Sequence, residues 1–235
     1  MEKNLLLSGL GYSEENFALM EKELNSYGIN NIIDFGNYIK YTKKSDEELV
    51  QSICEDFDIL TENNSTNIIC HSMGCNIGII LAKEKAVQIK KAVFLSPELQ
   101  KTTRQEKKIA KLRIIQGATN SSFAAVDCSG FYGTKPTFDL SNEQPAKIGA
   151  FDKLSLFKVF NQTKRLAIES LKDIDTLESF IAYGIADKFV SQEGAEKLAK
   201  ELDGTIMQIC TRHHNLLLSS CGNETAKQIT KFLKR

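Results

Sequence analysis

The feature that most constrains the fold of this chain is a regular alternation of short apolar runs with longer amphipathic segments. Mostly apolar runs predict strands at 4–8, 30–35, 66–70, 90–96, 179–184 and 205–210. Segments with helical periodicity follow at 14–28, 46–62, 74–86, 191–202 and 223–235. Ser13 and Ser45 are expected to cap the first two helices. Apolar strands separated by helices are typical of a parallel sheet covered on both sides, so the sequence predicts an α/β fold with a mostly parallel central sheet.

The alternation is interrupted once, between Pro97 and the strand at 179–184. Residues 98–175 contain a basic segment, a turn-rich stretch and one predicted helix at 151–171. The strand–helix pattern is the same on both sides of this interruption. We therefore expect a single domain of residues 1–235 with 98–175 as an insertion.

The charge balance argues against nucleic acid or an anionic membrane as a partner. Lysine plus arginine and aspartate plus glutamate both number 30, so no overall field attracts polyanions. No window reaches the roughly 18 consecutive apolar residues of a membrane-spanning helix, and the first apolar run is too short for a signal peptide. We therefore expect a cytoplasmic protein without a membrane span. The six cysteines form no CxxC pair and no zinc-ligand pattern, so we expect free thiols and no metal site.

Polar side chains that can take part in catalysis follow several of the predicted strands. In an open parallel sheet, ligands bind beyond the carboxyl ends of the strands. Ser72 follows the third strand in the stretch CHSMG, directly before a predicted helix. A sharp turn there lifts the hydroxyl out of the sheet at a helix N-terminus, where a developing negative charge is stabilised. Ser72 is therefore the candidate nucleophile, and the alternative is a serine that only caps the helix.

A serine nucleophile needs a base within hydrogen-bond distance, and the chain contains only three histidines. His71 is adjacent to Ser72, but neighbouring residues of a strand point to opposite faces, so we do not expect His71 to reach the hydroxyl. His213 and His214 both follow the last predicted strand. We favour His214 as the base, because the leucines of HNLLL can then pack onto the domain while the imidazole faces the site. His213 remains the alternative.

An orienting carboxylate and oxyanion donors complete the candidate site. Asp187 follows the fifth predicted strand and is favoured as the acid. Asp34 also lies near a strand end, and Asp203 fits a turn. The backbone N–H groups of Leu10 and Met73 are the candidate oxyanion donors.

The substrate pocket is expected to combine a glycine-rich turn with aromatic side chains of the insertion. Gly9 and Gly11 lie on either side of Leu10, so the backbone there can approach a substrate closely. Gly9, Phe131 and Tyr132 are the candidate substrate-binding residues. The insertion's aromatic residues can either line an acyl pocket or only attach the insertion to the core: Phe123, Phe131, Tyr132, Phe138, Phe151, Phe157 and Phe160.

Taken together, these motifs resemble those of the α/β-hydrolase superfamily. IICHSMGCNIGIILA is similar to its nucleophile elbow, FIAYGIADKFV to its acid-bearing strand and turn, CTRHHNLLL to its histidine loop and LLLSGLGYS to its oxyanion loop. The resemblance implies a catalytic triad of Ser72, Asp187 and His214, the two oxyanion donors named above, and a lid formed by 98–175. Cys70 stands where the elbow usually has its first glycine, a departure that we expect the fold to tolerate.

The sequence therefore predicts a serine hydrolase that cleaves a small-molecule carboxylic ester or thioester through an acyl-enzyme on Ser72, without a metal or organic cofactor. One alternative substrate is an acyl group on an acyl-carrier protein, for which the basic residues within 101–113 would form a rim. A second alternative is a ligand-binding protein that kept the fold and lost turnover, although an intact serine, histidine and aspartate argue against it. A nucleophilic Cys75 or Cys70 is disfavoured, because the first lies in the helix start and the second in the strand.

Overall fold

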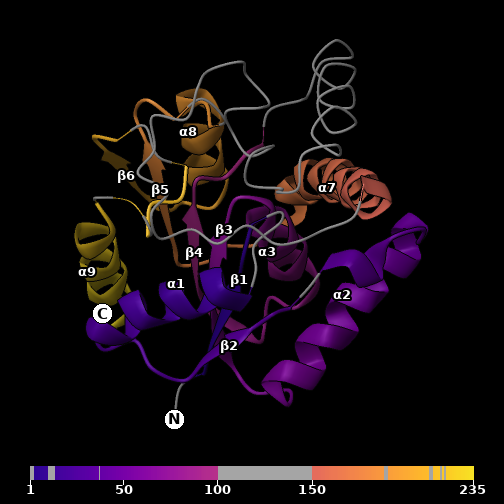
Figure 1. The fold of residues 1–235 in the computed structure, drawn as a ribbon, viewed down its shortest axis with the longest axis horizontal. Coiled ribbons are helices and arrows are strands. Elements are labelled where there is room, and N and C mark those ends of the chain that lie inside the picture. The colour runs from indigo at the N-terminus through magenta and orange to yellow at the C-terminus, as the bar shows by residue number, and fades with distance from the viewer. Residues whose placement is uncertain are drawn as a thin grey trace.

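Six parallel strands form the centre of the molecule in the part of the chain that this computed structural model describes, residues 3–9, 14–36, 38–99, 150–187, 190–211, 214–217, 219 and 221–235. The strands are β1 (Lys3–Leu7), β2 (Ile32–Asp34), β3 (Thr66–His71), β4 (Ile89–Leu95), β5 (Ser179–Gly184) and β6 (Thr205–Ile209). The helices are α1 (Glu14–Ser26), α2 (Asp46–Thr61), α3 (Met73–Glu84), α7 (Ala150–Ser170), α8 (Gln192–Glu201) and α9 (Gly222–Leu233), with short 3-10 helices η1 (Tyr38–Tyr41) and η3 (Leu171–Asp173) (Figure 1).

The strand order β2-β1-β3-β4-β5-β6 places β1 inside the sheet although it comes first in the chain. All neighbouring strands run parallel. The chain moves outward from β1 to β2, returns past β1 to β3, and then continues in one direction to β6. The order therefore reverses between β1 and β3, and such a reversal opens a crevice at the carboxyl ends of the two strands.

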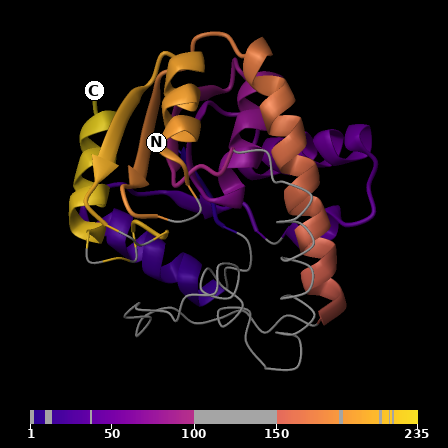
Figure 2. The ribbon, with the colours of Figure 1, turned by 90° about the horizontal axis from the view of Figure 1, so that it is seen from above.

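Helices cover both faces of the sheet, and each face has its own apolar core. Leu5 and Leu7 of β1 belong to the core that contains residues of α2, α3, α7 and α8, whereas Leu6 belongs to the core that contains residues of α1 and α9. Figure 2 shows α1 and α9 on one side of the sheet and α3 and α7 on the other. The predicted parallel sheet with helices on both faces is confirmed.

Capping side chains mark the starts of two helices. Ser45 forms a complete capping box at α2, because its hydroxyl accepts from the Glu48 N–H and its own N–H donates to the Glu48 carboxylate. Ser191 accepts from the Gly194 N–H at the start of α8. Ser13, the other expected cap, lies outside the described residues.

The second strand is shorter than the expected run at 30–35. Asn31 has a positive φ of 55°, which delays the start of β2. At the other end, the Asp34 carboxylate accepts a hydrogen bond from the Gly36 N–H and turns the chain. The 3-10 helix η1 follows this turn and was not expected from the sequence pattern.

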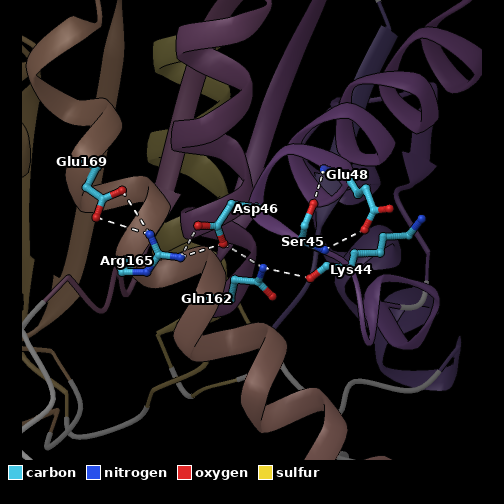
Figure 3. A network of polar contacts seen from close by, with 7 residues as sticks. All are labelled: Lys44, Ser45, Asp46, Glu48, Gln162, Arg165 and Glu169. Atoms are coloured by element: carbon cyan, nitrogen blue, oxygen red, sulfur yellow. Dashed lines mark hydrogen bonds and ion pairs between the residues drawn. The ribbon is translucent and has the colours of Figure 1, made fainter.

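Polar side chains join α7 to the amino-terminal end of α2 (Figure 3). The Arg165 guanidinium donates to both carboxylate oxygens of Asp46 at 2.6 Å and also pairs with Glu169. The Gln162 amide donates to Asp46 and to the carbonyl oxygen of Lys44. Asp46 lies in the first turn of α2, where a negative charge is also favoured by the helix dipole. The helix α7 is thus fixed to α2 as well as to α3.

The expected insertion at 98–175 is described only in part. Residues 100–149 lie outside the described residues, whereas α7 and η3 form its second part. The predicted helix at 151–171 agrees with α7 within one residue at each end. None of the described helices, α7 included, is long and apolar enough to cross a membrane.

Candidate active site

Ser72 lies in a tight turn between β3 and α3, at the point where the strand order reverses. Its backbone has φ 53° and ψ −117°, an uncommon conformation for a residue with a side chain. Gly74 permits the turn, because a Cβ atom at this position would overlap the backbone carbonyl of Leu7. The Ser72 hydroxyl makes no capping hydrogen bond to α3, so the alternative interpretation of Ser72 as a helix cap is wrong.

A second glycine accommodates the buried side chain of Cys70. Cys70 is fully buried in β3, and a Cβ atom at position 78 would overlap its sulfur. Gly78 therefore leaves the space that the Cys70 side chain occupies. The helix α3 therefore packs closely against β3 although position 70 is occupied by cysteine.

A continuous chain of hydrogen bonds joins Ser72, His214 and Asp187. His214 Nε2 lies 2.8 Å from Ser72 Oγ, and His214 Nδ1 lies 2.8 Å from Asp187 Oδ2. The Asp187 side chain is fully buried, and an ionised carboxylate can only accept, so Nδ1 carries the proton. Nε2 is then the acceptor for the Ser72 O–H, the arrangement that a general base needs. The three residues follow β3, β5 and β6, so the sheet itself brings them together.

The other candidates for base and acid lie elsewhere or outside the described residues. His214 occupies the position between the hydroxyl and the carboxylate, and His213 lies outside the described residues. Asp34 is engaged in the turn after β2 with Gly36. Asp203 lies in the turn after α8 with a φ of 48°.

Two buried side chains hold the backbone of His214 in place. His71 Nε2 lies 3.1 Å from the carbonyl oxygen of His214, and the Ser96 hydroxyl donates to the same oxygen at 2.6 Å. Burial, and then the nearby His214, lowers the pKa of His71 to about 3, so the neutral ring donates from Nε2. As expected, His71 does not reach Ser72. Its contact with His214 was missed, although a polar residue at the end of an apolar strand was a signal for it.

The loop of the expected oxyanion donors is described up to Gly9. Met73 is the first residue of α3, and the N–H groups of a first helical turn have no acceptor within the helix. Gly9 is buried directly after Ser8, and Leu10 lies outside the described residues. The Tyr38 hydroxyl donates to the carbonyl oxygen of Ser8 at 2.6 Å. Tyr38 of the unexpected η1 therefore supports the start of this loop.

A buried ion pair lies close to the His214–Asp187 pair. Lys164 of α7 donates to the Glu98 carboxylate at 2.7 Å, and the two side chains are 5% and 19% exposed. Burial raises the pKa of Glu98, while the Lys164 charge opposes this rise. Two smaller influences come from the candidate site, since His214 lowers the pKa of Glu98 and Asp187 raises it. The Lys164–Glu98 pair, which attaches α7 to the rest of the protein, is thus part of the electrostatic environment of the candidate site.

The aromatic residues that the structure describes on α7 belong to the core. Phe157 and Phe160 are buried with ring centroids 6.3 Å apart, in the same core as Met73. They contribute to packing α7 against the molecule, and a role in an acyl pocket stays a prediction. Outside the described side chains lie Phe123, Phe131, Tyr132, Phe138, Phe151 and the basic residues within 101–113.

The two cysteines near the turn are unsuited to nucleophilic attack. The Cys75 sulfur lies 3.4 Å from the carbonyl oxygens of Cys70 and Leu95. Burial raises the pKa of both the Cys75 and the Cys70 thiols. A thiol must ionise to act as a nucleophile, so neither competes with Ser72.

Solved structures resemble this chain over nearly its whole length. The monoacylglycerol lipase of Paleococcus ferrophilus is 21% identical, with a TM-score of 0.64 over 98% of this chain and 93% of its own. The enol-lactonase of Burkholderia xenovorans is 12% identical, with a TM-score of 0.67 over 100% and 92%. An α/β-hydrolase enzyme from a Medee basin deep-sea metagenome library is 16% identical, with a TM-score of 0.69 over 100% and 90%. No protein-family model matches the chain, and no curated protein matches it.

Proposed function

This chain has the α/β-hydrolase fold, and on that premise we propose that it hydrolyses a carboxylic ester through an acyl-enzyme on Ser72. The observation that carries the proposal is the pair of 2.8 Å hydrogen bonds that link Ser72, His214 and Asp187. A protein that only binds a ligand has no need of a base that is oriented by a carboxylate and in contact with a hydroxyl. The similar structures include a lipase and an enol-lactonase, which agrees with an ester as the substrate.

In the proposed reaction, Ser72 Oγ attacks the acyl carbonyl carbon while His214 Nε2 takes the hydroxyl proton. The buried Asp187 carboxylate stabilises the imidazolium that forms. His214 then returns the proton to the leaving oxygen as the carbon–oxygen bond of the ester breaks. A water molecule attacks the acyl-enzyme with His214 again as the base, which releases the carboxylic acid and restores Ser72.

We assign the oxyanion to the backbone N–H of Met73 together with that of Leu10. Met73 follows Ser72 directly at the start of α3, where the helix dipole favours negative charge. Removal of a single oxyanion donor typically raises the barrier by about 2.7–4 kcal/mol. The bond from Tyr38 to the Ser8 carbonyl supports the strand end from which the Leu10 loop begins.

We also propose that the segment 98–175 forms a cap over the acyl side of Ser72, with α7 as its main described element. The contacts of α7 with α2, through Arg165, and with Glu98, through Lys164, support a helix that is held in place. In this proposal, the domain is continuous from 1 to 235 and the cap is an insertion in it. A pocket between the cap and α3 would receive the acyl chain.

The proposal is tested by labelling with a fluorophosphonate probe, which reacts with an activated serine. We expect one adduct on Ser72, its loss in Ser72→Ala, and much slower labelling in His214→Ala. Cys75→Ala serves as the control, because it alters the same turn without touching the hydrogen-bond chain, and it should keep the label. A folded wild type that takes no label would overturn the proposal and favour a ligand-binding protein.

A further inference from the structure

Asn76 is a buried amide on α3 that makes no hydrogen bond. Its side chain is 0% exposed, and neither Nδ2 nor Oδ1 has a partner among the described residues. Asn67 is a useful comparison, since it is also buried but donates from Nδ2 to the Asn4 side chain at 3.0 Å, while its Oδ1 has no partner among the described residues. Asn76 therefore differs from Asn67 in having neither end of its amide paired.

An amide with both ends unpaired is costly in a protein interior. Each buried polar group without a partner lowers stability by about 1–3 kcal/mol, and most such groups in native proteins have a partner. An apolar residue of similar shape would avoid this loss at position 76. An orphaned group of this kind is explained when a water or a ligand group completes its hydrogen bonds.

The helix geometry places Asn76 on the side of α3 that faces away from the sheet. Gly74 and Gly78 mark the opposite side, because a Cβ atom at either would overlap atoms of β1 or β3. Asn76 is two residues from both, which is about 200° around an α-helix. This side of α3 packs against α7 (Figure 1).

Asn76 also lies close to the proposed nucleophile along the helix axis. It follows Ser72 by four residues, a rise of roughly 6 Å. The Cα–Cβ bonds of a helix tilt toward its N-terminus, so the Asn76 amide covers the turn that contains Met73. The amide is thus directed toward the Ser72 end of α3, on the side where α7 lies.

We propose that Asn76 binds the substrate and selects an ester with a hydroxyl group on its acyl chain, near the scissile carbonyl. A hydroxyl is the smallest group that can accept from Nδ2 and donate to Oδ1. The spacing of about one helical turn between Asn76 and Ser72 favours a hydroxyl on the third carbon of the acyl chain. This inference rests on the proposed function of Ser72, because it names the substrate class of the same site.

The first test is thermal unfolding of Asn76→Leu, with Asn67→Leu as the matched control. We expect Asn76→Leu to raise the Tm by about 2–4 °C, since an unpaired amide is replaced by an apolar group of similar shape. Asn67→Leu removes an existing hydrogen bond and should lower the Tm. A lower Tm for Asn76→Leu would mean that the amide is already satisfied in the free protein, and it would overturn the inference.

The second test compares two esters that differ only in the hydroxyl, such as the phenyl esters of 3-hydroxybutanoic and butanoic acid. We expect kcat/KM of the wild type to favour the hydroxy ester about tenfold, and Asn76→Leu and Asn76→Ala to lose this preference. Asn67→Leu should retain it. Equal rates for the two esters in the wild type, or an unchanged preference in both Asn76 variants, would overturn the inference.

Fluorophosphonate labelling separates this failure from a failure of the proposed function. If the wild type takes no label on Ser72, the hydrolase proposal itself is wrong and the inference falls with it. If the wild type and Asn76→Leu are both labelled but show no preference for the hydroxy ester, only the role of Asn76 is wrong.

Discussion

Lys164 and Glu98 form a 2.7 Å ion pair that is almost closed off from water, and it connects α7 to the end of β4. The other anchor of α7, between Arg165 and Asp46, has side chains that are 49% and 39% exposed. The two pairs attach the same helix in different surroundings. Removing one partner of a buried pair leaves an uncompensated charge, whereas water screens an exposed pair. Breaking the Lys164–Glu98 pair should therefore cost more stability than breaking the Arg165–Asp46 pair.

Substitution of Lys164 should destabilise the protein far more than substitution of its neighbour. We expect Lys164→Met to lower the free energy of unfolding by about 3–5 kcal/mol, because Glu98 is left buried without its cation. Arg165→Ala, the matched control on the same helix, should lower it by less than about 1 kcal/mol. Urea denaturation of both variants measures the difference. Similar losses for the two variants would contradict this assignment.

The raised pKa of Glu98 gives stability a pH dependence of unusual sign for a carboxyl. The unfolded chain releases this proton near the ordinary value of 4.5, while folded Glu98 keeps it to higher pH. The contribution of Glu98 to the free energy of unfolding therefore falls as the pH rises from 4.5 through the raised pKa. Urea denaturation of the wild type and Glu98→Gln across this range isolates the effect. A wild-type advantage that grows with pH would refute it.

His71 should make the stability of the protein depend on pH over a defined acidic range. Its pKa is lowered from 6.5 to about 3, so between these values the unfolded chain binds a proton that the folded protein does not. Stability is then lost as the pH falls from 6.5 toward 3, by at most about 1.4 kcal/mol per pH unit. His71→Gln keeps an amide donor but cannot titrate, and its stability should depend less on pH in this range. An unchanged slope in His71→Gln would exclude His71 as the cause.

The hydrogen bond from Ser96 should matter for activity more than for binding. Ser96→Ala removes the 2.6 Å contact to the carbonyl oxygen of His214, so the imidazole is less well placed against Ser72. We expect fluorophosphonate labelling to slow about tenfold, with little change in KM for an ester substrate. Ser179→Ala is the control, since this buried hydroxyl of β5 has no partner among the described residues. Equal labelling rates in both variants would argue against a positioning role for Ser96.

Alanine substitutions at two glycines should separate steric overlap from backbone strain. Gly74→Ala places a Cβ against the backbone of Leu7 and must displace either β1 or α3, so we expect Ser72 labelling to be lost. Gly36 has a φ of 88° with open space around it, so Gly36→Ala should lower stability by only about 1–2 kcal/mol and keep the label. Labelling followed by mass spectrometry distinguishes the two. Retained labelling in Gly74→Ala would show that the turn can relax.

The sheet and the hydrogen-bonded residues could be predicted because their signals are local. Apolar runs marked all six described strands, and the polar residues within three positions of their ends included Ser72 and Asp187. The two adjacent histidines were a harder choice, since spacing alone does not say which imidazole turns inward. Packing of the following leucines favoured His214, and Leu216 and Leu217 are indeed buried.

The supporting contacts were not predicted, because they end on backbone carbonyl oxygens, which no residue type in the sequence marks. The bonds from His71 and Ser96 to His214 span 143 and 118 residues, and no periodic pattern relates their ends. Tyr38 and Ser8 meet only because β1 and β2 are neighbours in the sheet. In the sequence, Asn76 cannot be distinguished from any other polar residue of a helix. Only its burial makes it informative.

The position of β6 at the edge of the sheet affects which part of the protein unfolds first on heating or in denaturant. Ser72 follows an interior strand, whereas His214 follows a strand that pairs with only one other of the described strands and exposes Ile206. Edge elements with exposed backbone open at a lower free energy than a sheet centre. Mild heat or denaturant should then separate His214 from Ser72 while most of the fold persists. Loss of fluorophosphonate labelling would then precede melting, and the pairing of β5 with β6 would set the resistance of the candidate site to heat.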